Sequence, residues 1–161
     1  MIYSYTFETT IGKLEIQEEW GKIVSLRPLQ KGQPSPPHNS HKPSDLLYEA
    51  YTQLKEYFNG KRISFDLPTA LSGTEFQLKV WSELQNIPYG KTASYKEIAI
   101  NTGSPKAARA VGNANNKNPI LIIVPCHRVI KSSGDIGDYA FGSSMKRYLL
   151  ELEKENFGAG L

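Results

Sequence analysis

Residues 94–115 read SYKEIAINTGSPKAARAVGNAN, and this stretch decides the fold of the second half of the chain. Ser94 is a suitable N-cap residue, and Glu97 stands at the reciprocal position of a capping box. These two residues predict a helix over residues 95–101, which Gly103 ends. A second short helix follows after this glycine-bearing turn, and two short helices joined in this way are typical of a helix-turn-helix.

The second helix of the pair is predicted over residues 106–115, with Pro105 at its first helical position. It consists largely of small residues, which let a helix backbone approach closely whatever it docks against. Two interpretations remain open, namely close packing inside the fold or a face that meets nucleic acid. Arg109 favours the nucleic-acid face, because an arginine among alanines can project its guanidinium group without crowding. The small residues are Ala107, Ala108, Ala110, Gly112 and Ala114.

A candidate nucleophile follows further along the chain. The apolar, β-branched run of residues 120–124 predicts a buried strand, and Pro125 ends its ladder of hydrogen bonds. The next residues are Cys126, His127 and Arg128, and the imidazole and guanidinium groups can lower the thiol pKa from its free value of about 8.5. Adjacent residues on an extended strand point to opposite faces, so we expect a water to relay the proton between thiol and imidazole. A lone cysteine after a buried strand is more often inert core, and its two neighbours argue against that interpretation.

The first part of the chain predicts a small sheet with a helix. Its β-rich composition and turn residues indicate three strands between residues 2 and 24. Residues 30–43 contain four prolines and predict a surface loop, whose two histidines lack the cysteine or carboxylate cluster of a metal site. Apolar residues at helical spacing predict a helix over residues 44–59, and a short strand is expected at residues 63–67.

The linking region and the architecture follow from these elements. Thr74 and Gln77 form a possible capping box, which predicts a helix that Pro88 stops. The predicted fold class is α/β. A small N-terminal domain of β-sheet and helix (residues 1–68) is expected to pack on a mainly helical C-terminal domain (residues 69–161), which holds the helix-turn-helix and an active-site strand and loop.

Composition excludes several classes of protein. The chain has 161 residues, of which 39% are hydrophobic and 22% charged, as in an ordinary globular protein. No apolar run approaches the roughly 20 residues of a membrane-spanning helix, and no secretory signal is expected. The single cysteine, Cys126, excludes an intramolecular disulfide and a multi-cysteine zinc site, and it favours a reducing, cytoplasmic setting. The formal net charge of +3 lies entirely after residue 68, which is compatible with nucleic-acid binding without demanding it.

Residues 125–129, PCHRV, resemble the active-site signature of the O6-alkylguanine-DNA alkyltransferases, also called methylated-DNA–protein-cysteine methyltransferases. The resemblance is strong from about residue 73 to residue 153 and weak before that. It implies a DNA-repair protein that flips an alkylated guanine out of the duplex from the minor groove. The other segments similar to family motifs, in order and at the family spacing, are Ser94-Tyr95, residues 107–112 (AARAVG), Asn118-Pro119 and residues 146–150 (KRYLL).

The resemblance also implies a set of catalytic residues. Cys126 would attack the alkyl carbon by direct displacement, with His127 taking its proton through water and Glu153 orienting the imidazole. Tyr95 would donate a proton to the leaving guanine, and Asn118 would brace the turn between the recognition helix and the active-site strand. Because the thioether product is stable, each molecule would act once, without a cofactor or a metal ion.

Further residues are assigned by the same resemblance to DNA binding and to the substrate pocket. Arg109 would fill the gap that the flipped base leaves in the stack, and main-chain groups of Cys126 and Val129 would read the base edge. The implied partner is double-stranded DNA containing O6-alkylguanine, bound by a monomer that has no membrane attachment. The implied DNA-binding residues are Ser94, Ala107, Ala108, Arg109, Ala110, Gly112 and Arg128, and the implied pocket residues are Val129, Tyr139, Ala140 and Lys146.

Three other functions compete with repair. The nearest is an alkylation-sensing DNA-binding module without turnover, but such proteins replace the nucleophile, and Cys126 is present. A helix-turn-helix regulator whose cysteine senses alkylation normally carries an extra DNA-binding or regulatory segment. A Cys/His hydrolase would turn over repeatedly and would leave the helix-turn-helix and Arg109 unexplained.

Overall fold

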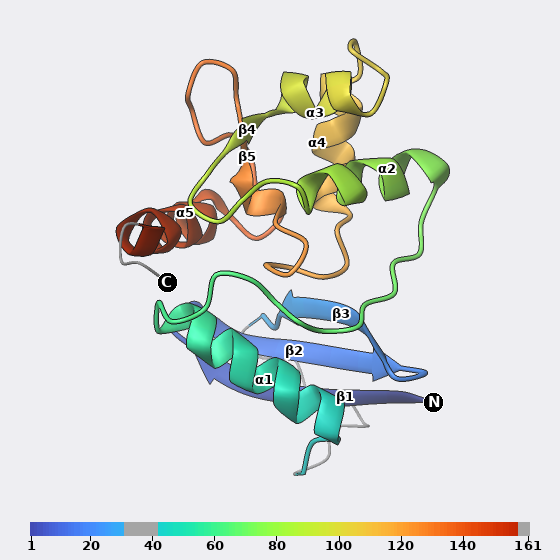
Figure 1. The fold of residues 1–161 in the computed structure, drawn as a ribbon, viewed down its shortest axis with the longest axis vertical. Helices are drawn as coiled ribbons and strands as arrows, with labels where there is room; N and C mark the ends of the chain where they lie inside the picture. Colours follow the sequence, from blue (N-terminus) through green and yellow to red (C-terminus); the bar gives the residue numbers. More distant parts are fainter. Residues whose placement is uncertain (31–41, 158–161) are drawn as a thin grey trace. The chain divides into compact units, whose positions relative to one another are not determined.

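The structure of the protein is a computed structural model, and it describes residues 1–30 and 42–157. The surface loop predicted over residues 30–43, with its two histidines, therefore lies almost entirely outside the described residues. The chain forms two compact units, Met1–Leu71 and Ser72–Leu161, whose helices and strands are labelled in Figure 1.

The N-terminal unit is a three-stranded antiparallel sheet with one helix, as the sequence predicted. The helix is α1 (Asp45–Phe58), and Ser44 caps it by accepting a hydrogen bond from the main-chain nitrogen of Leu47. The strands are β1 (Ile2–Thr9), β2 (Gly12–Glu19) and β3 (Lys22–Pro28).

Helix α1 lies across one face of this sheet (Figure 1). The strand register pairs Phe7 with Leu14 and Ile16 with Leu26, and all four side chains are buried. The ring of Phe7 meets the ring of Tyr51 from α1 edge to face, with 5.0 Å between their centroids. Burial of each such side chain is worth about 1.5–3 kcal/mol, so this apolar layer holds the unit together.

The strand expected at residues 63–67 is absent, and that prediction is wrong. In place of strand pairing, the side chain of Gln53 on α1 forms hydrogen bonds with the main chain of this segment. Its Oε1 accepts from the nitrogen of Asp66 at 2.9 Å, and its Nε2 donates to the oxygen of Asp66 at 3.1 Å. The edge of β3 pairs with residues that follow this segment. The nitrogen of Ile23 donates to the oxygen of Pro68 at 2.8 Å, and its oxygen accepts from the nitrogen of Ala70 at 3.0 Å.

The C-terminal unit is mainly helical and contains the predicted helix-turn-helix. Both predicted capping boxes are present, one between Thr74 and Gln77 and one between Ser94 and Glu97. None of the helices within the described residues is long and apolar enough to cross a bilayer. The elements are α2 (Glu75–Leu84), β4 (Ala93–Ser94), α3 (Tyr95–Asn101), α4 (Ala108–Asn116), a 3-10 turn η1 (Cys126–Arg128), β5 (Val129–Ile130) and α5 (Ser143–Phe157).

Helix α4 begins later than predicted, and Pro105 is not its first helical residue. The chain turns at this point, where the nitrogen of Ala107 donates to the oxygen of Ser104 at 2.9 Å. Ala107 is then the N-cap residue, and it has no side-chain cap hydrogen bond. The first two residues of the predicted helix, 106 and 107, therefore belong to this turn.

Residues 120–124 form a tight buried turn, so the predicted strand is wrong although the predicted burial is right. The side chain of Asn118 holds this turn, because its Nδ2 donates to the oxygen of Val124 at 2.7 Å and its Oδ1 accepts from the nitrogen of Ile120 at 3.0 Å. The nitrogen of Val124 also donates to the oxygen of Ile120 at 3.0 Å. Ile122 has a φ of 69°, a value that β-branched residues rarely adopt.

We predict that Ser94→Ala lowers the free energy of unfolding by about 1 kcal/mol, because the main-chain nitrogen of Glu97 loses its cap acceptor. Urea denaturation of the whole chain measures this change. The control is Ser82→Ala at an exposed position within α2, which should not lower stability, because alanine is the better helix former. Equal effects of the two substitutions would contradict the role of the cap.

Candidate active site

Cys126 begins the 3-10 turn η1 and is 5% exposed. Burial raises the pKa of its thiol. The nearby polar side chains of Asn118 and Tyr139 and the charge of Lys146 act in the opposite direction and lower this pKa. Because burial is the larger effect, the thiol is protonated at rest, and it needs a base at the moment of attack.

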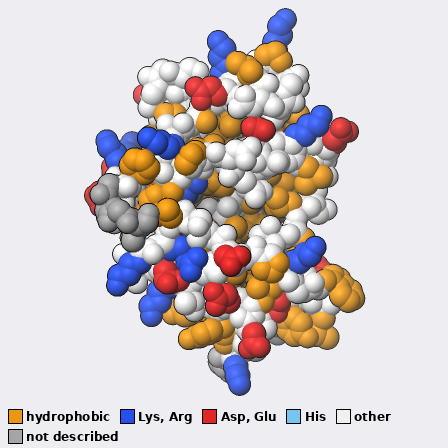
Figure 2. All heavy atoms as spheres, in the orientation of Figure 1, with side chains coloured by type: hydrophobic (Ala, Val, Ile, Leu, Met, Phe, Trp, Pro, Cys, Tyr) orange, Lys and Arg blue, Asp and Glu red, His pale blue; other side chains and the backbone are white. Residues whose placement is uncertain are grey.

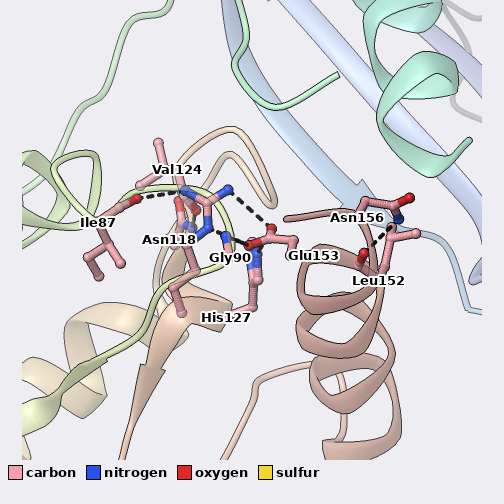
Figure 3. Close-up of polar contacts among 9 residues, drawn as sticks. Ile87, Gly90, Asn118, Val124, His127, Leu152, Glu153 and Asn156 are labelled. Carbon is pink, nitrogen blue, oxygen red and sulfur yellow. Dashed lines mark hydrogen bonds and ion pairs between the residues drawn. The ribbon is translucent and has the colours of Figure 1, made fainter. Parts of the chain in front are cut away.

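The carboxylate of Glu153 on α5 lies at the centre of a buried polar network (Figure 3). Its Oε2 lies 2.6 Å from Nε2 of His127 and accepts from Nη2 of Arg128 at 3.1 Å. Its Oε1 accepts from Nε of Arg128 at 2.8 Å and from the main-chain nitrogen of Gly90 at 3.3 Å. Both carboxylate oxygens are therefore held by donors from separate parts of the C-terminal unit.

These contacts set the charges in the network. Burial alone would raise the pKa of Glu153, but the hydrogen bonds with His127 and Arg128 and the positive charge of Arg128 outweigh burial and lower the pKa to about 2. Burial also lowers the pKa of His127 against the opposing pull of Glu153. At neutral pH the network therefore contains a carboxylate, a guanidinium and a neutral imidazole.

The tautomer of His127 follows from this arrangement. Since Nε2 faces a carboxylate, we assign the proton to Nε2, which leaves Nδ1 with a free lone pair. Nδ1 is buried and has no hydrogen-bond partner among the described residues. Its lone pair is therefore available to accept a proton.

The structure corrects the predicted DNA-binding role of Arg128. Its side chain is buried, with two of its nitrogens on Glu153 and Nη1 donating to the main-chain oxygen of Ile87 at 2.7 Å. The guanidinium also lies 5.7 Å from the centroid of the Tyr89 ring. A phosphate group could reach this guanidinium only by breaking the network, so Arg128 is part of the support of Glu153.

Tyr95, at the start of α3, meets Lys146 of α5. Nζ of Lys146 donates to the Tyr95 hydroxyl at 3.3 Å and to the main-chain oxygen of Asp138 at 3.1 Å. Burial, with the charges of Asp138 and Cys126, raises the pKa of Tyr95. Burial lowers the pKa of Lys146 to about 8 against the opposing charges of Cys126 and Asp138. The pair is thus a protonated hydroxyl beside an ammonium group that gives up its proton readily.

The other predicted pocket residues differ in exposure. Val129 is buried and starts β5, whereas Ala140 is exposed. The buried Tyr139 hydroxyl has no hydrogen-bond partner among the described residues. Burial, together with the neighbouring Cys126, raises the pKa of Tyr139 well above its ordinary value. Its ring meets that of Phe141 edge to face, with 5.9 Å between centroids. Tyr139 and Lys146 therefore influence the pKa of the thiol, while Ala140 lies at the surface.

The predicted DNA-binding residues of α4 separate into two groups. Arg109 and Ala110 are exposed, whereas Ala107 and Ala108 are half-buried. Gly112 lies against Tyr95, since a Cβ on it would stand 3.8 Å from that ring. Ser94, also predicted to bind DNA, is half-buried and occupied as the N-cap of α3.

The distribution of surface charge indicates a DNA-binding face less clearly than the exposed residues of α4 do. Figure 2 shows Lys and Arg side chains dispersed over the visible face and interspersed with Asp and Glu. A candidate DNA-binding surface is therefore indicated by the exposed residues of α4 and not by one basic patch on that face. Among the described residues there is also no group of three or more His, Cys, Asp or Glu side chains that could hold a metal ion.

Sequence reasoning missed two members of the site. Ile87 and Gly90 contribute main-chain groups to the network around Glu153, and main-chain groups leave no side-chain signal in a sequence.

We predict that Glu153→Gln destabilises the protein by about 3 kcal/mol at neutral pH, because it leaves Arg128 without its buried counter-charge. The pKa of Glu153 is lower in the folded protein than its ordinary value of 4.5, so its contribution is complete above that pH and is lost as the pH falls towards 2. Urea denaturation across this range should show the difference between wild type and variant shrinking.

The control for this experiment is Glu151→Gln, an exposed carboxylate on the same helix. It should change stability by less than about 0.5 kcal/mol at any pH. A difference between wild type and Glu153→Gln that stays constant from pH 4.5 down to 2 would contradict the assigned ionisation.

Comparison with known proteins agrees with this geometry. Two family models match, the "6-O-methylguanine DNA methyltransferase, ribonuclease-like domain" over residues 1–71 and the "6-O-methylguanine DNA methyltransferase, DNA binding domain" over residues 75–155. A methylated-DNA–protein-cysteine methyltransferase of Methanosarcina acetivorans is 47% identical over 154 residues, which cover 94% of this chain and 98% of the relative.

A solved structure is similar over most of the chain. The crystal structure of Mycobacterium tuberculosis OGT in complex with DNA has a TM-score of 0.86 and 46% sequence identity, and the match covers 96% of this chain and 94% of that chain. These findings confirm the resemblance first indicated by the PCHRV segment. The chain belongs to the 6-O-methylguanine DNA methyltransferase family.

Proposed function

We propose that this protein repairs O6-alkylguanine in double-stranded DNA by transferring the alkyl group to Sγ of its own Cys126. The activity is that of a methylated-DNA–[protein]-cysteine S-methyltransferase. The observation that carries the proposal is the unpartnered Nδ1 of His127, a neutral base that is held by Glu153 on its other nitrogen and directly follows the only cysteine. Family membership and the DNA complex of the Mycobacterium tuberculosis relative support it.

The buried network around Glu153 assists deprotonation of the Cys126 thiol. No hydrogen bond joins Cys126 to His127 directly among the described residues, so one water between them relays the proton from Sγ to Nδ1. The imidazolium that forms is stabilised by the carboxylate of Glu153 at 2.6 Å. The charge of Lys146 and the nearby polar side chains of Asn118 and Tyr139 favour the thiolate once it forms.

Transfer then proceeds by displacement at the alkyl carbon. The bond from Sγ to carbon forms as the bond from carbon to O6 breaks, and the electron pair stays on the guanine. Tyr95 donates its hydroxyl proton to the base, so that a neutral guanine leaves. Lys146 lies 3.3 Å from that hydroxyl and stabilises the phenolate that remains.

DNA reaches the site through the helix-turn-helix. Chemistry on a base inside a duplex requires that the base be rotated out of the stack. Helix α4 offers Ala110 as a small exposed residue for close approach in the minor groove, with Arg109 exposed beside it to fill the vacated place. Backbone phosphates supply most of the affinity, so we expect little sequence preference.

The reaction consumes the protein. A thioether has no good leaving group, so Cys126 is not regenerated and each chain acts once. We place the protein in the cytoplasm, since its nucleophilic thiol requires a reducing compartment, and we expect it to act as a monomer without a cofactor.

The test is incubation with duplex DNA containing a single O6-methylguanine, followed by mass spectrometry of the protein and analysis of the DNA. The wild-type chain should gain one methyl group on Cys126 and restore guanine in the DNA. Cys126→Ser should gain none and should still bind the duplex, because the thiol is buried and the exposed residues of α4 are unchanged.

Two outcomes would contradict repair. Binding to the damaged duplex without methyl transfer would indicate the lesion-sensing module. Repeated turnover without a lasting mass gain would indicate a hydrolase. Undamaged duplex of the same sequence serves as the control for both measurements.

A further inference from the structure

Lys146 carries a buried positive charge that has no carboxylate in contact with it. Its side chain is fully buried on α5. Nζ donates to the hydroxyl of Tyr95 at 3.3 Å and to the main-chain oxygen of Asp138 at 3.1 Å, and both acceptors are neutral. The lysines that form ion pairs within the described residues belong to β2 and α2, not to α5. Burial of an ammonium group without a paired carboxylate favours its neutral form.

The titratable groups that act on Lys146 come from three elements. They are Tyr95 on α3, Cys126 and His127 on η1, and Asp138 in the loop between β5 and α5. At rest the hydroxyl, the thiol and the imidazole are uncharged. Asp138 therefore contributes the only negative charge of these four groups, because an exposed aspartate is ionised at neutral pH.

The loop keeps Asp138 close to the ammonium group. Its main-chain oxygen accepts from Nζ of Lys146 and also from the hydroxyl of Tyr95, at 3.4 Å. Gly137, just before it, has a φ of 75°, and a Cβ at this position would stand 3.0 Å from the Tyr95 hydroxyl. The Asp138 carboxylate forms no hydrogen bond or ion pair with the described residues, so it acts on Lys146 through its charge.

This charge matters because Lys146 titrates close to neutral pH. Burial lowers the pKa of Lys146 to about 8, against the charges of Cys126 and Asp138, which raise it. At pH 7 the group is still mostly ammonium, but a further fall of its pKa would leave much of it neutral. The ammonium form favours the Cys126 thiolate and stabilises the phenolate of Tyr95 in the proposed mechanism.

We propose that Asp138 is a positioning residue, whose exposed carboxylate keeps Lys146 as an ammonium ion beside Tyr95 while the alkyl group is transferred. This inference rests on the proposed repair function and adds to it a residue that acts only through Lys146. The carboxylate also has a cost, because a negative charge near the site weakens the attraction of DNA phosphates. Removal of the charge should therefore slow transfer at alkaline pH without weakening DNA binding.

The test uses Asp138→Asn, which keeps the main-chain oxygen and removes the charge. The matched control is Asp135→Asn, which removes an exposed carboxylate from the same loop, where the main chain of Asp135 bonds Lys131 and Ser133. Asp138→Glu restores the charge. Three quantities are measured for each: the rate of methyl transfer at saturating O6-methylguanine duplex from pH 6.5 to 9, the affinity for undamaged duplex at low salt, and the titration of Lys146.

The titration of Lys146 is followed by NMR of lysine-labelled protein without DNA, with the signal assigned by its loss in Lys146→Arg. Asp138→Asn should lower the pKa of Lys146, because a charge that raises it has been removed. Its transfer rate relative to wild type should be one or more at pH 6.5 and should fall about threefold by pH 9. Its affinity for undamaged duplex should equal or exceed that of wild type.

The two other variants separate this effect from a general change of charge. Asp135→Asn should change the affinity in the same direction, but its Lys146 titration and its relative rate should stay level across the pH range. Asp138→Glu should reproduce the wild-type pH profile.

Three results would overturn the role of Asp138. An unchanged Lys146 titration in Asp138→Asn would show that the carboxylate does not act on the ammonium group. An equal shift in Asp135→Asn would show an effect of net charge alone. A lowered Lys146 pKa with an unchanged rate profile would show that transfer does not need the ammonium form. Absence of transfer by the wild-type chain would instead contradict the proposed function, and the NMR titration would still test the action of Asp138 on Lys146.

Discussion

An ionised carboxylate in a dry interior is the constraint on which the C-terminal unit depends. Glu153 is almost fully buried, and a lone charge there would cost several kcal/mol. It stays ionised because Arg128 and His127 surround it, together with the main-chain nitrogen of Gly90. The helix α5, the turn η1 and the loop after α2 must therefore hold their places together, since each supplies one part of this network.

The chemistry of the site follows from how charges and protons are distributed within that network. Arg128 neutralises Glu153, so His127 does not need to be charged and remains a base. The same burial that keeps the imidazole neutral keeps the Cys126 thiol protonated, which protects it until a substrate arrives. Tyr95 and Lys146, which are hydrogen-bonded to each other, retain protons to give. The site thus contains both a proton acceptor and a proton donor, as a displacement with a poor leaving group requires.

Short-range rules predicted much of this fold. The caps at Ser94 and Thr74 set the starts of α3 and α2, because a cap and its partner are three residues apart. The strand predicted over residues 120–124 failed because Asn118, outside the run, satisfies its main chain in a turn. The support of Glu153 by Arg128 spans 25 residues of sequence, and no local pattern indicates such a contact.

The central claim is that His127 is a neutral base with its proton on Nε2. Nitrogen NMR of protein labelled at histidine measures this directly, with the signal assigned by its loss in His127→Gln. The account predicts, at pH 7, a protonated Nε2 and an unprotonated Nδ1. An imidazolium at that pH, or a proton on Nδ1, would contradict it.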